Sequence, residues 1–230
     1  MINIFIGYDK RETVGYHVCC NSLIRHSTTP LCLTPLALSN LNGYHEMHTD
    51  GSNQFIYSRF LVPYLMDFRG WALFIDGDMI VRSDIADLWA MRDDTKAVMC
   101  VQHNYQTKAP VKYLGSVNQN YPRKNWSSVV LWNCSHPSNR QVTPEFVEAA
   151  TGAHLHRFNW LNDREIGSLP LAWNWLPDEY GENHDAKLLH FTLGLPCFIE
   201  YADTPMAAEW HRERMLMDYS DQSNVMNNMP

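Results

Sequence analysis

The feature that most constrains this chain is an apolar run at residues 71–75 (WALFI) that leads directly into Asp76-Gly77-Asp78. A short apolar run closed by turn-forming residues predicts a strand that is buried on both faces. Carboxylates at the end of such a strand are costly to bury without a positive partner. We therefore expect something cationic to bind at the end of this strand.

Short apolar runs alternate with helical patterns along the chain. Strands are predicted at residues 2–6, 31–38, 71–75, 97–102, 127–132 and 187–191, and helices at residues 14–26, 55–68, 83–89, 144–150 and 163–169 and beyond Pro205. This alternation predicts an α/β domain with a mostly parallel central sheet and helices on both faces. Thr13 is the expected cap of the first helix, and Pro35 suits an edge strand. We expect one domain over residues 1–219 and a disordered tail over 220–230.

The net charge is −7 and the sequence pI is about 5.8, which argues against a nucleic-acid partner. Hydrophobic residues make up 45% of the chain and charged residues 19%, as in an ordinary globular protein. A negative chain can still bind a nucleotide, because a divalent cation supplies the positive charge that a diphosphate needs.

Cysteine usage and the N-terminal segment bear on location. The six cysteines show no C-x-x-C pair, and the start of the chain lacks the basic region of a signal peptide. No apolar stretch reaches the roughly 18 residues that span a bilayer. We expect a cytoplasmic protein without a transmembrane segment. Peripheral membrane association through a lipid-linked acceptor stays open, although no basic amphipathic helix supports it.

The two carboxylates predict a metal site. Oxygen donors with one imidazole suit Mn²⁺ or Mg²⁺, and such ions complete their coordination with substrate phosphate oxygens. Gly77 leaves the backbone free for close approach of a ligand. An isolated Asp-x-Asp is more often a solvated loop, so the interpretation depends on the rest of the chain.

Several segments, in order, resemble the glycosyltransferases of the nucleotide-binding α/β type called GT-A, and family 8 in particular, across residues 2–200. The segments are residues 4–9 (IFIGYD), 57–60 (YSRF), 74–81 (FIDGDMIV), 127–133 (SSVVLWN), 163–165 (DRE) and 190–196 (HFTLGLP). The resemblance implies a metal-dependent transfer from a nucleotide-sugar, by default a UDP-sugar, to a carbohydrate or glycoconjugate acceptor, with retention.

The resemblance also implies roles for single residues. Asp76, Asp78 and His190 would ligate the metal. Tyr8 and Asp9 would contact the base and ribose of the donor, with Gly77 and Gly194 close to it, and Arg59 would approach its phosphate or sugar.

The chain departs from the family pattern at the lysine that binds the diphosphate, because the matching position holds Leu195. Arg59, Arg11 or a residue of the loop before Asn53 could supply that charge. In a retaining transfer the diphosphate itself could take the acceptor's proton. An inverting transfer would need a carboxylate base, for which Asp163 and Glu165 are the candidates.

Aromatic residues in the second half suggest sugar contacts. Trp126, Trp160 and Trp173 are candidates for contact with the donor or acceptor sugar, whereas Trp132 is expected in the core. The polar insertion at residues 103–125 is a candidate lid. Two other functions remain open: a sugar-nucleotidyltransferase, and a non-catalytic nucleotide- or glycan-binding protein of the same fold.

Overall fold

The computed structural model describes residues 1–112 and 115–218, so the tail expected at 220–230 lies outside the described residues. A six-stranded sheet with the order β2-β1-β3-β8-β5-β9 forms the centre. Its strands are β1 (Ile2–Tyr8), β2 (Leu31–Ala37), β3 (Trp71–Ile75), β5 (Val98–Val101), β8 (Val129–Asn133) and β9 (Ile166–Leu169). β1 runs parallel to β2 and β3, β5 runs parallel to β9, and β8 runs opposite to β3 and β5. The predicted α/β class with a mostly parallel sheet is confirmed, and β2, which contains Pro35, is an edge strand as predicted.

Alternate residues of the strands supply two separate cores. Phe5 and Phe74 point to one face of the sheet, and Ile4 and Leu73 point to the other. Strands that bury both faces read as continuous apolar runs, which is why residues 71–75 contain no polar position. The sheet is therefore a layer between two apolar cores.

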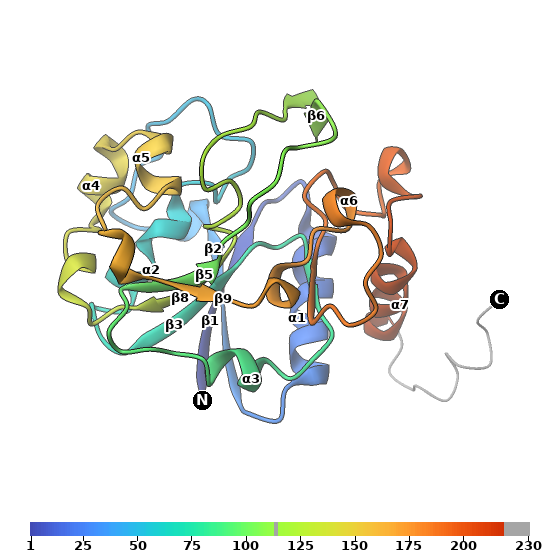
Figure 1. The fold of residues 1–230 in the computed structure, drawn as a ribbon, viewed down its shortest axis with the longest axis horizontal. Helices are drawn as coiled ribbons and strands as arrows, with labels where there is room; N and C mark the ends of the chain where they lie inside the picture. The colour runs from blue at the N-terminus through green and yellow to red at the C-terminus, as the bar shows by residue number, and fades with distance from the viewer. Residues whose placement is uncertain (113–114, 219–230) are drawn as a thin grey trace.

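Helices cover both faces (Figure 1). They are α1 (Thr13–His26), α2 (Val62–Leu65), α3 (Ile85–Trp89), α4 (Pro144–Ala149), α5 (Gly152–His156), α6 (Pro177–Tyr180) and α7 (Ala207–Asp218). α1 and α3 pack on the face of Ile4 and Leu73, and α2, α4 and α5 pack on the face of Phe5 and Phe74. α7 packs against the outer side of α1 through Trp210. No helix of the described residues is both long enough and apolar enough to cross a bilayer.

The chain leaves the sheet at the end of β3. After Asp76-Gly77-Asp78 it enters β4 (Met79–Val81), which pairs in antiparallel fashion with β10 (Leu188–His190). The backbone amide of Asp76 donates to Ser128 O, at 3.2 Å, and the amide of Phe191 donates to Asp78 O, at 3.1 Å. The turn is thus fixed at both ends, with β8 on one side and β10 on the other.

The single helix predicted over residues 55–68 is wrong. The segment forms a 3-10 helix, η2 (Ser58–Leu61), followed by the short α2. Pro63 lies in the first turn of α2, where its missing N–H costs nothing, and it cannot sit inside a longer α-helix. Asp67 and Phe68 then take φ values of 52°, which end the helical conformation.

Two other local predictions need correction. Residues 163–169 form a 3-10 turn, η5 (Asp163–Glu165), and then β9, because Ile166 and Leu169 are buried beside β5. Thr13 is the first residue of α1 rather than its cap. Its hydroxyl donates to Lys10 O, and Glu12 occupies the N-cap position without a side-chain hydrogen bond.

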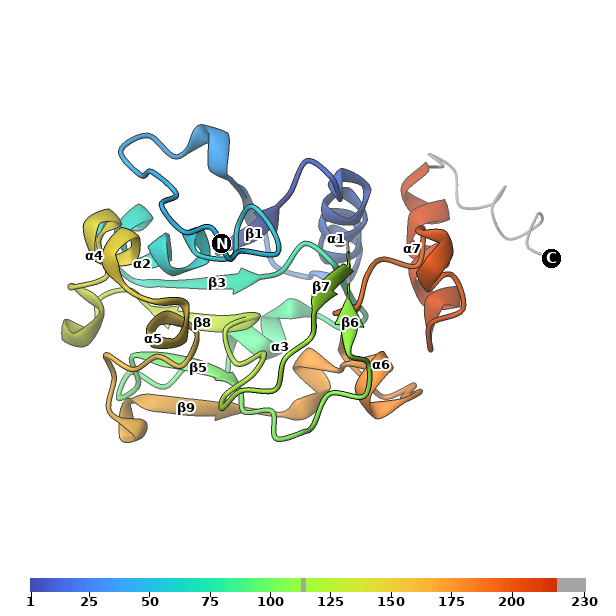
Figure 2. The same cartoon turned by 90° about the horizontal axis from the view of Figure 1, so that it is seen from above.

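The insertion at residues 103–125 contains a hairpin that the sequence analysis missed. β6 (Val111–Lys112) pairs with β7 (Ser116–Val117). Figure 2 shows this hairpin beyond the end to which β3 points. It belongs to the site described below.

Gly77 is required by close packing of the turn. A Cβ at this position would lie 2.3 Å from Gly7 O, which is a backbone atom and cannot move away cheaply. We expect Gly77→Ala to lower the free energy of unfolding by about 2 kcal/mol in a denaturant titration. Gly51→Ala is the matched control, because its Cβ would meet only a side-chain methyl of Ile56. Equal stability of the two variants would contradict the close-approach explanation.

Candidate active site

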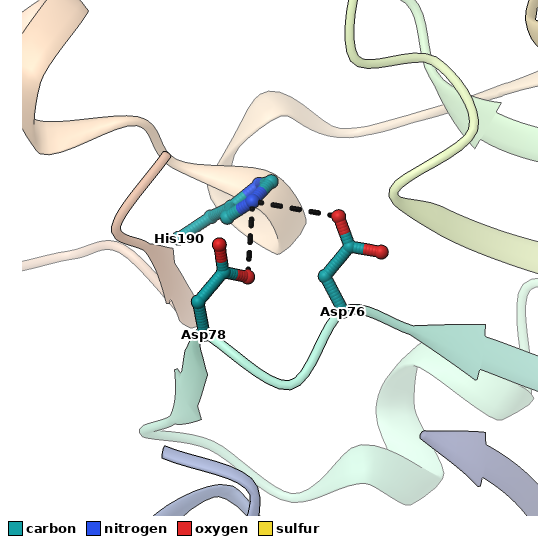
Figure 3. A group of neighbouring side chains, drawn as sticks. All are labelled: Asp76, Asp78 and His190. Atoms are coloured by element: carbon teal, nitrogen blue, oxygen red, sulfur yellow. Dashed lines mark ion pairs between the residues drawn. The ribbon is translucent and has the colours of Figure 1, made fainter. Parts of the chain in front are cut away.

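Three potential metal ligands converge at the end of β3. Asp76 follows β3, Asp78 precedes β4, and His190 ends β10, opposite Met79 in the strand pair. One ligand atom of each residue lies within 4.8 Å of the others. His190 Nε2 is 3.7 Å from Asp76 Oδ2 and 3.3 Å from Asp78 Oδ1 (Figure 3). The structure thus brings together the three predicted ligands from segments more than 100 residues apart.

Hydrogen bonding fixes the orientation of the His190 ring. Its Nδ1 lies 3.0 Å from Asn174 Oδ1, and the amide nitrogen of Asn174 donates to Ser128 Oγ at 2.7 Å. Because an amide oxygen can only accept, Nδ1 carries a proton in this contact, and Nε2 is the ring nitrogen that faces the aspartates.

This arrangement fits a divalent ion. Asp78 Oδ1 is buried and has no hydrogen-bond donor among the described residues. A histidine that binds a metal through one ring nitrogen usually donates a hydrogen bond from the other, as His190 does to Asn174. Two carboxylate oxygens and one imidazole nitrogen suit Mn²⁺ or Mg²⁺, with positions left for substrate oxygens.

Arg59 holds Asp76. Its Nη1 lies 2.8 Å from Asp76 Oδ1 and donates to Ser127 O at 3.1 Å, while Nε donates to Ile56 O at 3.1 Å. The guanidinium also lies over the rings of Phe55 and Phe74. With only 5% of its surface exposed, Arg59 is a buried positioning group for Asp76. Its predicted contact with the donor stays a prediction.

Burial disfavours negative charge at this site. Burial, opposed by Arg59 and reinforced by Asp78, raises the pKa of Asp76 to about 6. Burial and the charge of Asp78 raise the pKa of Glu12 to about 8. Carboxylates that are difficult to ionise next to one another indicate a site that is completed by a cation.

A cavity opens beside these residues. It has a volume of about 90 Å³ and adjoins a larger one of about 640 Å³. The smaller cavity is lined by all three potential ligands, by Arg59 and by Glu12, Asn53, Asn125, Ser127, Thr192 and Gly194. Both cavities share Ser52, Ile56, Lys112, Tyr121 and His156. A polar, partly enclosed space therefore leads away from the metal group.

The residues predicted to bind the nucleotide lie around the β1–α1 loop. Asp9 is buried and accepts from the Arg11 side chain, at 2.5 Å, and from the amide of Gln54, at 3.0 Å. Tyr8 Oη lies 3.2 Å from Thr13 Oγ1. Asp9 and Arg11 thus join the loop to residues 52–54, which border the cavity. Their contact with a nucleotide stays a prediction.

The two predicted glycines lie in tightly packed turns. Gly194 lines the cavity, and a Cβ there would meet the ring of Tyr201 at 2.3 Å. Gly77 lies between the two aspartates, as described above.

Asp163 and Glu165 are not brought to the cavity. β9, which they precede, runs in the same direction as β5 and β3. Asp163 and Glu165 therefore lie on the side of the sheet where β3 begins, away from Asp76 at its end. Glu165 accepts from Ser138 Oγ at 2.6 Å and caps η5 through Asn162. The Asp163 side chain is 86% exposed and pairs with Arg123. Neither residue contacts the metal group, so the geometry gives no support to a catalytic role.

The tryptophans predicted to contact sugars also lie elsewhere. Trp173 is fully buried in the core, as is Trp132, for which a core position was predicted. Trp160 packs against Trp132 with nearly parallel rings, and Trp126 donates to His103 O at 2.9 Å. None of the three candidates lines either cavity.

Sequence reasoning missed Glu12, Lys112 and His156. His156 ends α5, and its Nδ1 lies 2.8 Å from Ser127 Oγ while Nε2 is buried without a hydrogen bond among the described residues. Burial, reinforced by Arg59 and Lys112, holds the pKa of His156 well below its usual range. Each residue lies in a polar segment far from the Asp-Gly-Asp turn in sequence, and no local pattern marks it. Only the fold brings them to the site.

Comparison with known proteins gives the family. The family model described as Glycosyl transferase family 8 matches residues 38–192. The chain belongs to glycosyl transferase family 8. The protein named Protein CDI, from Arabidopsis thaliana, is 44% identical to this chain over 219 aligned residues, and the alignment covers 91% of this chain and 85% of that protein.

Solved structures of other glycosyltransferases share the fold. A galactosyltransferase, LgtC, crystallised with donor and acceptor sugar analogs, superimposes with a TM-score of 0.64 at 14% identity over 96% of this chain and 98% of that one. The glycosyltransferase GlyE of Streptococcus pneumoniae TIGR4 gives a TM-score of 0.62 at 15% identity over 98% of this chain and 62% of that one. The resemblance to GT-A family 8 enzymes is therefore confirmed for the fold.

Asn174 should matter for metal affinity in this family 8 chain. Asn174→Ala removes the acceptor that orients His190, so Mn²⁺ affinity should fall about tenfold, measured as free Mn²⁺ by electron paramagnetic resonance. Asn139→Ala is the matched control, because Asn139 is equally buried but bonds Ala97 O and Asn133 O. It should lose stability and keep its Mn²⁺ affinity. An unchanged affinity in Asn174→Ala would show that the ring needs no such support.

His156 should make stability depend on pH. Because its folded-state pKa is lowered, the folded protein does not take up the proton that the unfolded chain binds below about pH 6.5. Stability from this group is therefore present above pH 6.5 and is lost as pH falls. The destabilisation caused by His156→Asn should shrink by about 1 kcal/mol between pH 7.5 and 5.5 in urea titrations. A difference independent of pH would mean that His156 titrates normally.

Proposed function

We propose that this family 8 chain transfers a sugar from a nucleoside-diphosphate sugar, with UDP as the expected nucleotide, to a hydroxyl of a carbohydrate or glycoconjugate acceptor. The transfer depends on Mn²⁺ or Mg²⁺ and retains the configuration of the sugar. The observation that carries the proposal is the buried group of Asp76, Asp78 and His190 at the end of a central strand, beside a polar cavity.

The chain's own residues position the charges that this reaction needs. The bond between the sugar's anomeric carbon and the β-phosphate oxygen breaks, its electron pair goes to the diphosphate, and the acceptor oxygen bonds to the carbon. A divalent ion supplies electrostatic stabilisation for the departing diphosphate. Arg59 fixes Asp76 and Asn174 fixes His190, so that the ligands need not reorganise.

Two observations support retention of configuration and the position of the acceptor. The candidates for the base of an inverting transfer, Asp163 and Glu165, lie outside the cavity. A retaining transfer needs no such base, because the acceptor proton can pass to the departing phosphate oxygen. The adjoining cavity of about 640 Å³, which is lined by Asn118, Gln119, Tyr121, Lys124 and Arg157, offers polar contacts for an acceptor.

The test measures free nucleoside diphosphate after incubation with Mn²⁺ and a panel of nucleotide-sugars. The wild-type protein should hydrolyse one donor slowly without an acceptor, and chelation should stop the reaction. Asp78→Asn should reduce the rate by about 100-fold or more, because it weakens the ion that stabilises the leaving group. Asp185→Asn removes the same charge from an exposed position and should leave the rate unchanged.

Each other result has a distinct meaning. Release of pyrophosphate would indicate a nucleotidyltransferase instead. Binding of nucleotide without turnover on any donor or acceptor would indicate a binding protein. Full activity of Asp78→Asn, or activity in excess chelator, would exclude the metal-dependent mechanism.

A further inference from the structure

We propose that Lys112, on the β6–β7 hairpin, binds the diphosphate of the donor in the cavity that it shares with the metal group. This inference rests on the proposed function, because it assigns a phosphate-binding residue to the same site. The proposed cation belongs to the insertion at residues 103–125, in which no residue pattern indicates phosphate binding.

Arg59 and Arg11, the two arginines that the sequence analysis offered for the phosphate, already have carboxylate partners. Arg59 pairs with Asp76 at 2.8 Å, and Arg11 pairs with Asp9 at 2.5 Å. Each of these carboxylates is buried, so freeing its arginine would leave an unpaired charge inside the protein. These arginines therefore hold the site together and are poorly placed to change partner when a substrate arrives.

The position expected to hold a lysine is filled by core packing. Leu195 is fully buried in the cluster formed by Val18, Phe191 and Trp210 between α1 and α7. Gly15 lies against it so closely that a Cβ there would approach the Leu195 side chain to 2.6 Å. A phosphate-binding side chain cannot come from this position.

Lys112 is placed differently. It lines the cavity together with Asp76 and Asp78, and it also borders the larger adjoining cavity. Its ammonium makes one long contact, 3.5 Å to Ser52 Oγ, and no carboxylate of the described residues lies within ion-pair distance of it. A half-buried ammonium with so weak a partner can still accept an anionic ligand at little cost.

The base of the insertion is fixed to the body of the protein. Glu179, which is buried in α6, accepts from Thr107 Oγ1 at 2.9 Å and from the amide of Lys108 at 3.0 Å. Asn118 joins the segment after the hairpin to the segment before it. Its backbone amide donates to Pro110 O and its side chain donates to Ala109 O. Lys112 thus projects from an anchored segment, which lowers the entropy cost of holding a ligand.

Lys112 would offset part of the negative charge that the donor brings to the site. The two aspartates offset a divalent ion, and a nucleoside-diphosphate sugar brings about one negative charge on each phosphate. When the sugar leaves, the diphosphate gains further negative charge, so a fixed ammonium binds the product-like state more strongly than the ground state.

The experiment compares binding of a nucleoside diphosphate and of the matching monophosphate by calorimetry with Mn²⁺ present. The nucleotide is the one of UDP, GDP, ADP and CDP that the wild-type protein binds most tightly. Lys112→Met should weaken diphosphate binding about tenfold and monophosphate binding much less. Lys112→Arg should restore most of the loss. Lys108→Met removes an exposed charge from the same insertion and should bind like the wild type.

Equal affinity of Lys112→Met and the wild type for the diphosphate would overturn the assignment and leave the proposed function intact. Equal losses for both nucleotides, or failure of Lys112→Arg to recover binding, would also overturn it, since a general disturbance of the hairpin would then explain the effect. If the wild-type protein binds no nucleoside diphosphate, the proposed function itself fails. Thermal unfolding of each variant shows that the protein compared is folded.

Discussion

The structure is organised around two carboxylates, the buried Asp76 and the half-buried Asp78, at the end of a strand that is covered on both faces. Burying an unpaired carboxylate costs several kcal/mol, so the surrounding elements must supply compensation. Arg59 comes from η2 on one face of the sheet and His190 comes from β10. The carbonyl of Ser128, just before β8, accepts the Asp76 amide and fixes the turn. The same turn requires Gly77, because Gly7 of β1 lies against it. The Asp76-Gly77-Asp78 turn therefore depends on the order of the strands, on the close packing at Gly77 and on the charged residues around it.

The negative charges of Asp76 and Asp78 are only partly compensated by the surrounding residues, which indicates that the site binds a cation. Arg59 pairs with one oxygen of Asp76, whereas Asp78 Oδ1 is buried, has no hydrogen-bond donor among the described residues and lies 3.3 Å from His190 Nε2. A core built only for stability would replace such a group by apolar residues, because a poorly paired buried charge is destabilising. The chain instead uses buried polar contacts of Asn174 and Ser128 to hold the imidazole in place. Such an arrangement stores unfavourable electrostatic energy that a bound cation releases.

The sequence predicted the parts of this site that follow from local patterns. Residues 71–75 form a buried strand because every position is apolar, and the rule that ligands gather at strand ends then identified Asp76 and Asp78. His190, which ends another apolar segment, was predicted as a ligand from the resemblance to family 8. Asp163 and Glu165 were misplaced because a helical pattern was read where β9 follows a 3-10 turn, and the direction of a strand cannot be read from its residues. His156 and Lys112 could not be found, since each lies in a polar segment whose position depends on long-range packing. Short helices such as α5 have too few turns to show a period.

The insertion at residues 103–125 illustrates how a site can change its cation without changing its fold. Leu195 contributes to the contact of α1 and α7, and a lysine there would have to leave an apolar cluster. A positive charge is still required near the two aspartates once a diphosphate is bound, and Lys112 of the hairpin lines the same cavity as the aspartates. The buried carboxylate of Glu179 accepts hydrogen bonds from two donors of this insertion, the Thr107 hydroxyl and the Lys108 backbone amide. A dispensable surface loop would not need such an anchor. A charge on an anchored segment can therefore replace one from the core-packed segment, because the electrostatic requirement concerns where the charge lies and not which element carries it.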